Sequence, residues 1–454
     1  FPTPPDICYV NNFEDPARPK CLLLPAGYGK KLEEGIEEVL NFLKRETFKA
    51  FEGKDYEEEV SKLTKEFDTE KEKVFNELTE EAKKYNLMVL FSPQGIKLLP
   101  LFRIQAPVSE EELFKDPRIR EEYQKSLQEF EPIFRDYMRK LRDLDSAFGE
   151  ALFKLRDKIA EDLVSKAFEK LEEFFKEEVE VIKYFQDLKR ELIKNIHLFI
   201  EWEKARGNIM VQSSLNKAMN IFRINLLVDN SETKGAPVIY ERVPTLKGLF
   251  GQINYRAEMG ILYADHLSIT PGSLHKANGG FLVIDLWEIL KNPLIWVILK
   301  RVLLHKKLHL MGGMMEEIPV PHVGLLPDPV PFKAKVFLIG DPFLYYLLST
   351  YDEEFQELFK IKAEFDPLLP LDEETKESFP KIVKKMIEEE GLKELSASGL
   401  NELLKYTIYE SGNKKKVRFI LEEIKGLLRE AHVLSTNEEI TGEDVKRAYK
   451  EKIF

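Results

Sequence analysis

The stretch Gly272-Ser-Leu-His-Lys-Ala-Asn-Gly-Gly-Phe-Leu-Val-Ile-Asp285 decides the expected fold. Its glycine-bearing turn leads into a short strand, Phe281 to Ile284, which is apolar at every position and ends at a carboxylate. Continuous apolar strands are typical of parallel sheets covered by helices on both faces. Ligands bind such sheets beyond the carboxyl ends of their strands. We therefore predict an α/β sheet with Asp285 at that edge, where it either holds Mg²⁺ through water or caps the following helix.

Composition limits the classes of protein to consider. A chain of 454 residues should form about two to four domains, and 43% hydrophobic residues suffice for their cores. A net charge of −12 argues against a dominant nucleic-acid-binding role. Cys8 and Cys21 form neither a metal cluster nor a disulfide framework, which fits a reducing cytoplasm. The sequence contains no membrane span and no signal peptide. It begins at Phe1 instead of Met, so we expect a longer parent polypeptide.

Helical periodicity dominates the first half of the chain. After a short strand at residues 6–10, apolar residues recur at steps of three and four from about residue 30 to residue 199. Residues 86–102 interrupt this pattern and read as a small β-hairpin. Pro132 and Gly149 are expected to kink or break the longest helix. We predict an antiparallel, coiled-coil-like helical arm and disfavour a membrane-surface helix because its charges are mixed.

Strand signals return in the second half. They lie at residues 224–229, 237–240, 281–284 and 335–340, with a weaker one at 360–365, and helical patterns separate several of them. This alternation indicates an α/β sheet, and the purely helical pattern after residue 373 indicates a separate bundle. The predicted division is a first part of the sheet domain (1–26), the inserted arm (27–206), the rest of the sheet domain (207–370) and a helical lid (371–454).

No phosphate-binding loop of the form GxxxxGK[ST] is found in the sequence. The nearest imitation, Leu24-Pro-Ala-Gly-Tyr-Gly-Lys-Lys31, has leucine at the first glycine position and Lys31 where a hydroxyl should bind Mg²⁺. We interpret it as a turn that opens a helix. His275 and Asn278, beside the glycine turn, are expected to be structural hydrogen-bonding groups.

Several collinear motifs resemble those of Lon-type AAA+ proteases. Gly272 to Asp285 looks like the segment that leads into the Walker B strand. Gly235-Ala-Pro-Val-Ile-Tyr240, Leu249-Phe-Gly-Gln-Ile253 and Lys335-Val-Phe-Leu-Ile-Gly-Asp341 fit the same family. The first residues, Asp6-Ile-Cys-Tyr-Val-Asn-Asn-Phe13, do so as well. The best match is the Lon-like branch that carries a long helical insertion in its ATPase module. The resemblance implies an AAA+-type parallel sheet domain, a helical arm and an all-α lid.

The resemblance also implies a nucleotide site and its residues. Asp285 matches the Walker B aspartate. Asp341 matches a sensor position that orients water, with a cap at the strand end as the alternative. Leu286 replaces the glutamate that polarises the attacking water, so hydrolysis should be slow or absent. Lys360 and Lys362 lie near the arginine-finger position, where lysine is a poorer substitute for a planar guanidinium. Arg418 lies near the second sensor, and a solvated surface is the favoured interpretation of this basic residue. ATP and Mg²⁺ would be cofactors of the parent polypeptide only if this site is functional.

A loop that grips substrate is implied by the same resemblance. Phe250, Tyr255 and Tyr263 are the candidates for stacking against an extended peptide in a central channel, with a core role as the alternative for Phe250. The Ser–Lys peptidase residues of the family lie beyond the lid, so this chain carries none. We expect an ATPase-like module of a Lon-like endopeptidase that passes unfolded or misfolded polypeptide through a six-membered ring in cytoplasmic protein quality control. The alternative is a non-hydrolysing ring that scaffolds and gates an ATP-independent protease.

Overall fold

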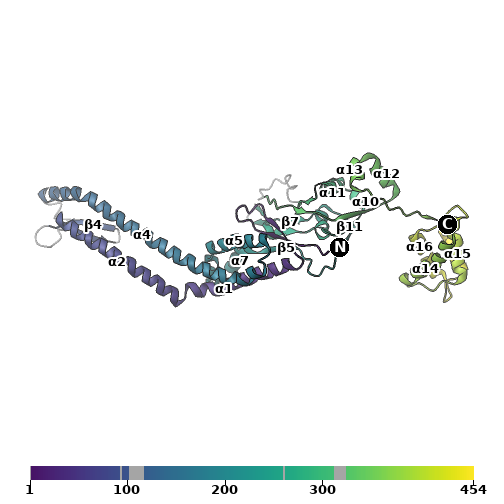
Figure 1. Cartoon of the computed structure of the whole chain (residues 1–454), viewed down its shortest axis with the longest axis horizontal. Coiled ribbons are helices and arrows are strands. Elements are labelled where there is room, and N and C mark those ends of the chain that lie inside the picture. Colours follow the sequence, from purple (N-terminus) through teal and green to yellow (C-terminus); the bar gives the residue numbers. More distant parts are fainter. Residues whose placement is uncertain (1, 93–94, 102–116, 259–260, 311–323, 454) are drawn as a thin grey trace. The chain divides into compact units, whose positions relative to one another are not determined.

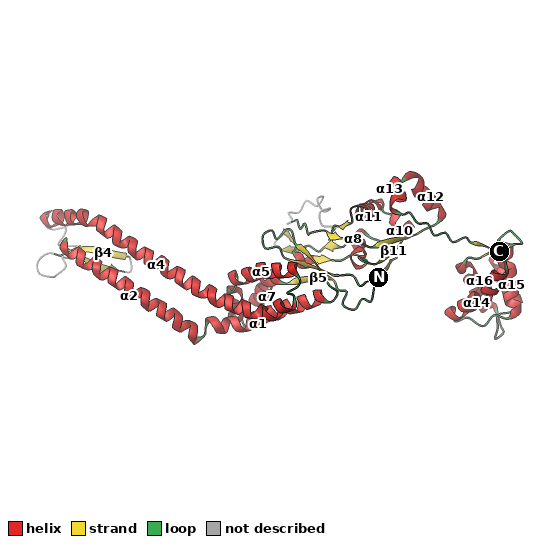
Figure 2. Cartoon of the chain, viewed as in Figure 1, coloured by secondary structure: helices red, strands yellow, loops and turns green. Residues whose placement is uncertain are grey.

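The computed structural model describes residues 2–92, 95–101, 117–258, 261–310 and 324–453, and divides into two compact units, Phe1–Leu358 and Phe359–Phe454. Figure 1 labels the elements along the chain, and Figure 2 distinguishes helices from strands. Within the described ranges, no helix combines the length and the apolar composition that a membrane crossing requires.

The first strand lies in an antiparallel sheet of its own. Strand β1 (Asp6–Val10) pairs with β2 (Lys20–Leu24) on one edge and with β5 (Ile224–Val228) on the other, and both pairings are antiparallel. The prediction that this strand belongs to the same parallel layer as Phe281 to Ile284 is wrong. Every residue of β1 is buried, and Cys8 and Val10 lie in an apolar core shared with helices α1 (Tyr28–Phe51), α5 (Val179–Lys194) and α6 (His197–Lys204).

A second sheet in this unit is parallel. Strand β11 (Phe281–Asp285) lies between β6 (Val238–Glu241) and β14 (Lys335–Ile339), and both pairings are parallel and in register. Hydrogen bonds connect the two sheet regions, since the Thr3 hydroxyl donates to the Thr233 carbonyl and Tyr9 donates to the Asp328 carbonyl. The parallel α/β sheet predicted around Asp285 is therefore present, but it is smaller than expected.

Two long helices and a hairpin form the arm. Helix α2 (Lys54–Lys84) is followed by strands β3 (Leu87–Ser92) and β4 (Gly95–Pro100), which confirm the predicted hairpin, and then by α4 (Pro117–Phe174). Helix α4 contacts both α1 and α2. Its contacts run in opposite order to theirs: Phe148 packs on Phe67, and Phe174 packs on Tyr28. The helices are therefore antiparallel, and α4 continues through Pro132 and Gly149 instead of breaking there.

The second unit is a small helical bundle with one β-ladder. Helices α14 (Glu373–Glu390), α15 (Ala397–Glu410), α16 (Leu421–Leu434) and α17 (Gly442–Ile453) enclose a separate apolar core. Strand β15 (Leu368–Pro370) pairs with β16 (Lys416–Arg418), so the unit begins before the expected boundary at residue 371 and is not purely helical after residue 373. The weak strand signal at 360–365 forms no strand.

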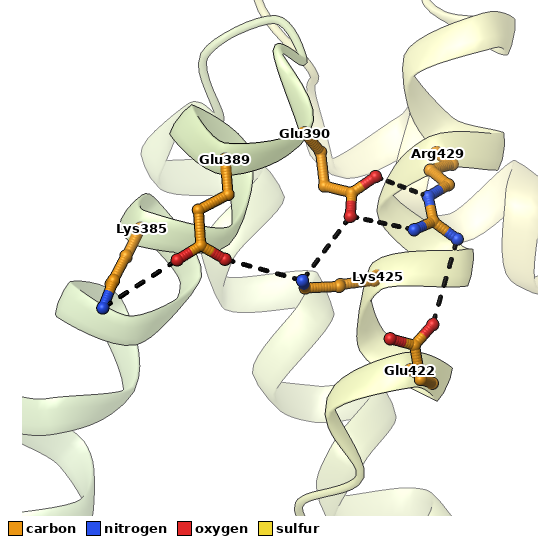
Figure 3. A network of polar contacts seen from close by, with 6 residues as sticks. All are labelled: Lys385, Glu389, Glu390, Glu422, Lys425 and Arg429. Atoms are coloured by element: carbon orange, nitrogen blue, oxygen red, sulfur yellow. Dashed lines mark hydrogen bonds and ion pairs between the residues drawn. The ribbon is translucent and has the colours of Figure 1, made fainter. Parts of the chain in front are cut away.

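An ion-pair network joins α14 to α16 on the surface of this bundle (Figure 3). The Arg429 guanidinium donates two hydrogen bonds to Glu390, at 2.8 and 2.9 Å, and lowers the pKa of that carboxyl. Lys425 links Glu390 to Glu389. Exposed pairs of this kind contribute little stability, so the apolar core holds the bundle together.

The remaining elements connect these parts. They are α7 (Ile209–Ala218), η1 (Met219–Phe222), α8 (Leu246–Phe250), β7 (Gln252–Ile253), β8 (Arg256–Glu258), β9 (Ile261–Tyr263), η2 (His266–Ser268), β10 (Ile269–Thr270), α9 (Ser273–Lys276), α10 (Leu286–Leu290), α11 (Pro293–His305), β12 (Lys307–Leu308), β13 (Val330–Pro331), α12 (Pro342–Tyr351) and α13 (Glu353–Leu358).

Candidate functional site

The carboxyl edge of the parallel sheet is the candidate site. The three strands run in one direction, so their carboxyl ends meet at one edge. Glu241 ends β6, Asp285 ends β11, and Asp341 follows β14 after one glycine. Sequence reasoning found the two aspartates and missed Glu241, which accepts a hydrogen bond from the Ser273 hydroxyl. A carboxylate at the end of a short strand was the signal that could have revealed it.

Asp285 caps the helix that follows it. Its Oδ1 accepts hydrogen bonds from the backbone N–H groups of Trp287 and Glu288, at 2.8 and 3.2 Å. The first N–H groups of a helix lack partners within the helix, which is why a carboxylate is favourable there. The helix-capping role, one of the two alternatives predicted for Asp285, is therefore present. Only Oδ2 is left without a protein donor among the described residues, and a ligand role for Asp285 stays a prediction.

No catalytic base follows Asp285. Leu286, which replaces the expected glutamate, is buried. Glu288 forms an ion pair of 2.5 Å with Lys291 one turn along its own helix. A base must lie within hydrogen-bonding reach of the water that it activates.

Asp341 is a helix cap like Asp285. Its carboxylate caps α12 by accepting a hydrogen bond from the Leu344 N–H at 2.9 Å.

The glycine turn before β11 is a packed structural element. The Gly272 N–H donates to Nδ1 of the buried His275, and burial lowers the pKa of this imidazole to about 3. Asn278 joins the turn to the strand region beyond it, since its side chain bonds the Pro331 carbonyl and the Lys333 N–H. A Cβ at Gly280 would lie 2.1 Å from a backbone carbonyl oxygen, so only glycine fits there. The predicted structural role of His275 and Asn278 is confirmed.

The basic candidates all lie in the second unit, and two of them have acidic partners. Arg418 donates to both oxygens of Glu423, at 3.0 and 2.8 Å. Lys362 pairs with Glu364 at 2.7 Å, and Lys360 is exposed. Their predicted roles toward a nucleotide stay predictions.

The three substrate-gripping candidates have different environments. Phe250 is fully buried at the end of α8, so it cannot stack on a peptide in a channel, and this prediction is wrong. Its alternative role in the core is the correct one. Tyr263 is exposed on the β8–β9 hairpin, whereas Tyr255, just before it, is half-buried. These two tyrosines stay candidates.

One face of the parallel sheet is open. Burial alternates along β11 instead of extending to both faces as expected, with Leu282 and Ile284 fully buried and their neighbours only partly so. The in-register pairing places one apolar set together on the other side, which we call the open face: Val238, Tyr240, Val283, Phe337 and Ile339. The four on the outer strands are between 49% and 66% exposed. Parallel sheets normally bury both faces, so this exposed apolar face is unusual.

The residues present do not form a complete nucleotide or metal site. The Asp285 and Asp341 carboxylates are engaged as helix caps, and the described residues contain no group of three His, Cys, Asp or Glu side chains able to hold a metal ion. A Mg²⁺ ion prefers several oxygen ligands, usually with substrate phosphates among them. The sheet edge alone therefore supplies no reaction step.

Three protein families match successive parts of the chain. Residues 6–39 match the Lon-like LonC helical domain, residues 234–366 match the LonB-like AAA domain, and residues 394–454 match the archaeal LonB AAA+ ATPase lid domain. The first match spans the predicted boundary between the first part of the sheet domain and the arm, the second lies within the predicted remainder of the sheet domain, and the third lies within the predicted lid. The chain is a Lon-like AAA+ protein. The match at residues 6–39 includes both β1 and the start of α1. In the structure, these two elements share one apolar core.

Curated relatives of this Lon-like chain share its family at low identity. A putative Lon protease homolog of Haemophilus influenzae is 21% identical over 276 residues, which are 56% of this chain and 44% of that protein. A putative Lon protease homolog of Escherichia coli is 31% identical over 107 residues, or 23% of this chain and 17% of that protein. The chain thus spans less than half the length of each. NtrX from Brucella abortus in complex with ADP gives a TM-score of 0.30 at 15% identity, covering 51% of this chain and 46% of that one, and carries no further argument.

Proposed function

We propose that this chain is the scaffold and substrate-handling module of a Lon-like protease, and that it does not itself hydrolyse nucleotide. The observation that carries the proposal is the buried Leu286 directly after Asp285, in a domain of the AAA type. AAA+ domains as a class bind nucleotides, but the position directly after Asp285 offers no base to activate water. The module would assemble as a ring, expected to be six-membered, in the cytoplasm.

Handling of unfolded polypeptide is the second part of this proposal. The matches to Lon-like domains support it, because the curated relatives are named putative Lon protease homologs. Tyr255 and Tyr263 would contact the substrate near the β8–β9 hairpin, and the arm would capture it or gate the entrance. A serine peptidase domain outside this chain would cleave it.

The open face favours a second candidate, an ATP-driven unfoldase. Val238 and Phe337 lie on the two outer strands of the sheet and expose apolar surface that a further strand and helix would cover. If that cover carried a phosphate-binding loop, Asp285 would lie at the edge of a complete nucleotide site, with its Oδ2 available to a hydrated Mg²⁺. The basic residues Lys360, Lys362 and Arg418 would then be the candidates for phosphate contacts.

A phosphate-release assay with the purified chain separates the two candidates. We expect no release from Mg-ATP above a no-protein blank, and no change on Leu286→Glu. Phosphate release that Asp285→Asn abolishes would overturn the non-hydrolysing assignment and support the second candidate. Binding of a permanently unfolded polypeptide, such as reduced and carboxymethylated lactalbumin, tests substrate handling independently of nucleotide.

A further inference from the structure

A groove follows the seam between helices α1 and α4. Its volume is about 920 Å³, and α1, the last part of α4 and Trp202 of α6 line it. Half-buried apolar side chains from both helices contribute to its walls, among them Phe42, Ala167 and Leu171. The helices approach closely here, since a Cβ at Gly35 would lie 2.4 Å from the Leu171 side chain. The groove therefore lies on a closely packed part of the first unit.

The charges around this groove are mainly positive, although the whole chain carries a net charge of −12. Five cations line it: Lys31, Lys44, Arg45, Lys166 and Lys170. Three anions accompany them: Glu34, Glu38 and Glu169. This excess of positive charge is local, so it would attract a ligand whose own charge is negative.

These groove cations lack ion-pair partners. Elsewhere on the helices, lysines pair with glutamates three positions away, as Lys49 does with Glu46 and Lys176 with Glu173. At the groove, the same spacing would allow Lys166 to pair with Glu169. Within the ranges that the structure describes, none of the five cations forms an ion pair, and Lys44 instead donates to the Asn216 side chain. The cations are thus available to an acidic ligand.

Aromatic rings lie near both ends of the groove. The Lys31 ammonium lies 4.5 Å from the centre of the Phe174 ring, which is 42% exposed, and the Lys44 ammonium lies 5.0 Å from the centre of the Trp202 ring. Lys31 and Lys44 are separated along α1 by about 20 Å at 1.5 Å per residue. An extended peptide of roughly six residues has this length. Each end therefore presents an apolar surface beside a positive charge.

We propose that the groove between α1 and α4 binds an extended segment of unfolded polypeptide in which acidic residues alternate with apolar ones. Carboxylates of the segment pair with Lys166, Lys170 and Arg45, and its apolar side chains cover Phe42, Phe174 and Trp202. The inference rests on the proposed substrate-handling function and specifies which segments the base of the arm selects. We choose an acidic ligand because the groove carries a local excess of positive charge, which complements the carboxylates of the segment. The negative charge of the rest of the chain would repel the same segment.

Fluorescence anisotropy with labelled peptides tests this selection. The probes are a peptide of about twelve residues that alternates Glu with Leu and Phe, and its counterpart with every Glu replaced by Lys. We expect the full chain to bind the acidic peptide at least tenfold more tightly, and added salt to weaken that binding. Equal or tighter binding of the basic peptide, or tighter binding of single-stranded DNA of similar length, would overturn the proposal.

Charge reversal in the groove has a matched control in the same helix. Lys166→Glu with Lys170→Glu should weaken binding of the acidic peptide at least tenfold. Lys154→Glu with Lys158→Glu has the same spacing, also on exposed positions of α4 but away from the groove, and should change binding less than twofold. Circular dichroism melts confirm that both variants fold. Equal binding by the two double variants would contradict the assignment.

The emission of Trp202 gives a second readout. The acidic peptide should shift the tryptophan emission of the chain, and Trp202→Phe should remove that shift while Trp287 and Trp296 remain. If wild type binds carboxymethylated lactalbumin but groove variants bind it equally well, the groove assignment fails and the proposed function stands. If wild type binds no unfolded polypeptide, both fail.

Discussion

At the scale of single residues, Asp285 has a structural task that can be separated from any ligand role. Its carboxylate accepts two backbone hydrogen bonds at the start of α10. Asp285→Ala should therefore lower the free energy of unfolding by about 1 kcal/mol, and Asp285→Asn, which keeps a capping oxygen, by only a few tenths. Urea denaturation followed by circular dichroism measures both. Equal losses in the two variants would show that the negative charge, and not the cap, stabilises this turn.

His275 makes stability depend on pH. Burial lowers the pKa of His275 to about 3 in the folded chain, below the ordinary value of 6.5. The unfolded chain thus binds a proton as the pH falls below 6.5 while the folded chain does not, so this contribution is complete above pH 6.5 and is lost toward pH 3. We expect a loss of about 2 kcal/mol between pH 6.5 and 4.5.

A variant isolates this contribution from that of other groups. His275→Gln removes the titrating imidazole and should flatten the pH dependence of the unfolding free energy by that amount, although packing changes shift the whole curve. Denaturant melts at matched pH values measure the slope for both proteins. Equal pH dependence in the two proteins would mean that His275 binds its proton over the same pH range in the folded and the unfolded chain.

At the scale of elements, the far end of the arm has a core of its own. Phe130 of α4 is fully buried among residues of α2 and the hairpin, including Leu78 and Val89. Phe130→Ala should destabilise this region by about 3–5 kcal/mol. Hydrogen exchange should become faster in residues 75–92 and 120–137 and stay unchanged in the lid. Phe153→Ala in the same helix, at an exposed position, is the control, and an equal response of the two variants would contradict a local core.

Elements with strong local patterns were predictable from the sequence. The long apolar repeat gave α4, and Ser92-Pro-Gln-Gly95 between two apolar runs gave the hairpin. Strands that form only by pairing with distant segments could not be predicted from the sequence. No strand is predicted at Lys20–Leu24, which becomes β2 because β1 pairs with it. Lys416–Arg418 lies in the purely helical pattern after residue 373 and becomes β16 by pairing with Leu368–Pro370.

The candidate site shows the same limit. The apolar run Phe281 to Ile284 correctly predicted a strand ending at Asp285, but its burial on both faces was wrong because β6 and β14 leave one face open. Phe250 was ambiguous in the sequence, since an aromatic residue fits either a core or a substrate loop, and only packing decides between them. Glu241 directly follows the predicted strand at residues 237–240, so its position could be predicted, but its partner Ser273 could not because it lies far along the chain.

At the scale of the whole molecule, the two units should fold independently. The lid core is built entirely from its own residues, with Phe379, Leu403 and Leu427 among those fully or nearly fully buried. A unit of this size with a closed apolar core is expected to be stable by several kcal/mol on its own. Residues 359–454 expressed alone should therefore show a helical circular dichroism spectrum and a single cooperative thermal transition.

Two matched substitutions in helix α16 test whether this core causes that stability. Leu427→Lys places an unpaired charge in the core, which costs more than the unit can lose, so the isolated lid should be unfolded at 25 °C. Val433→Lys changes an exposed position near the end of the same helix, where a positive charge is favourable, and should leave the melting temperature within a few degrees of wild type. A broad, non-cooperative melt of the wild-type lid would show that its folding requires residues 1–358.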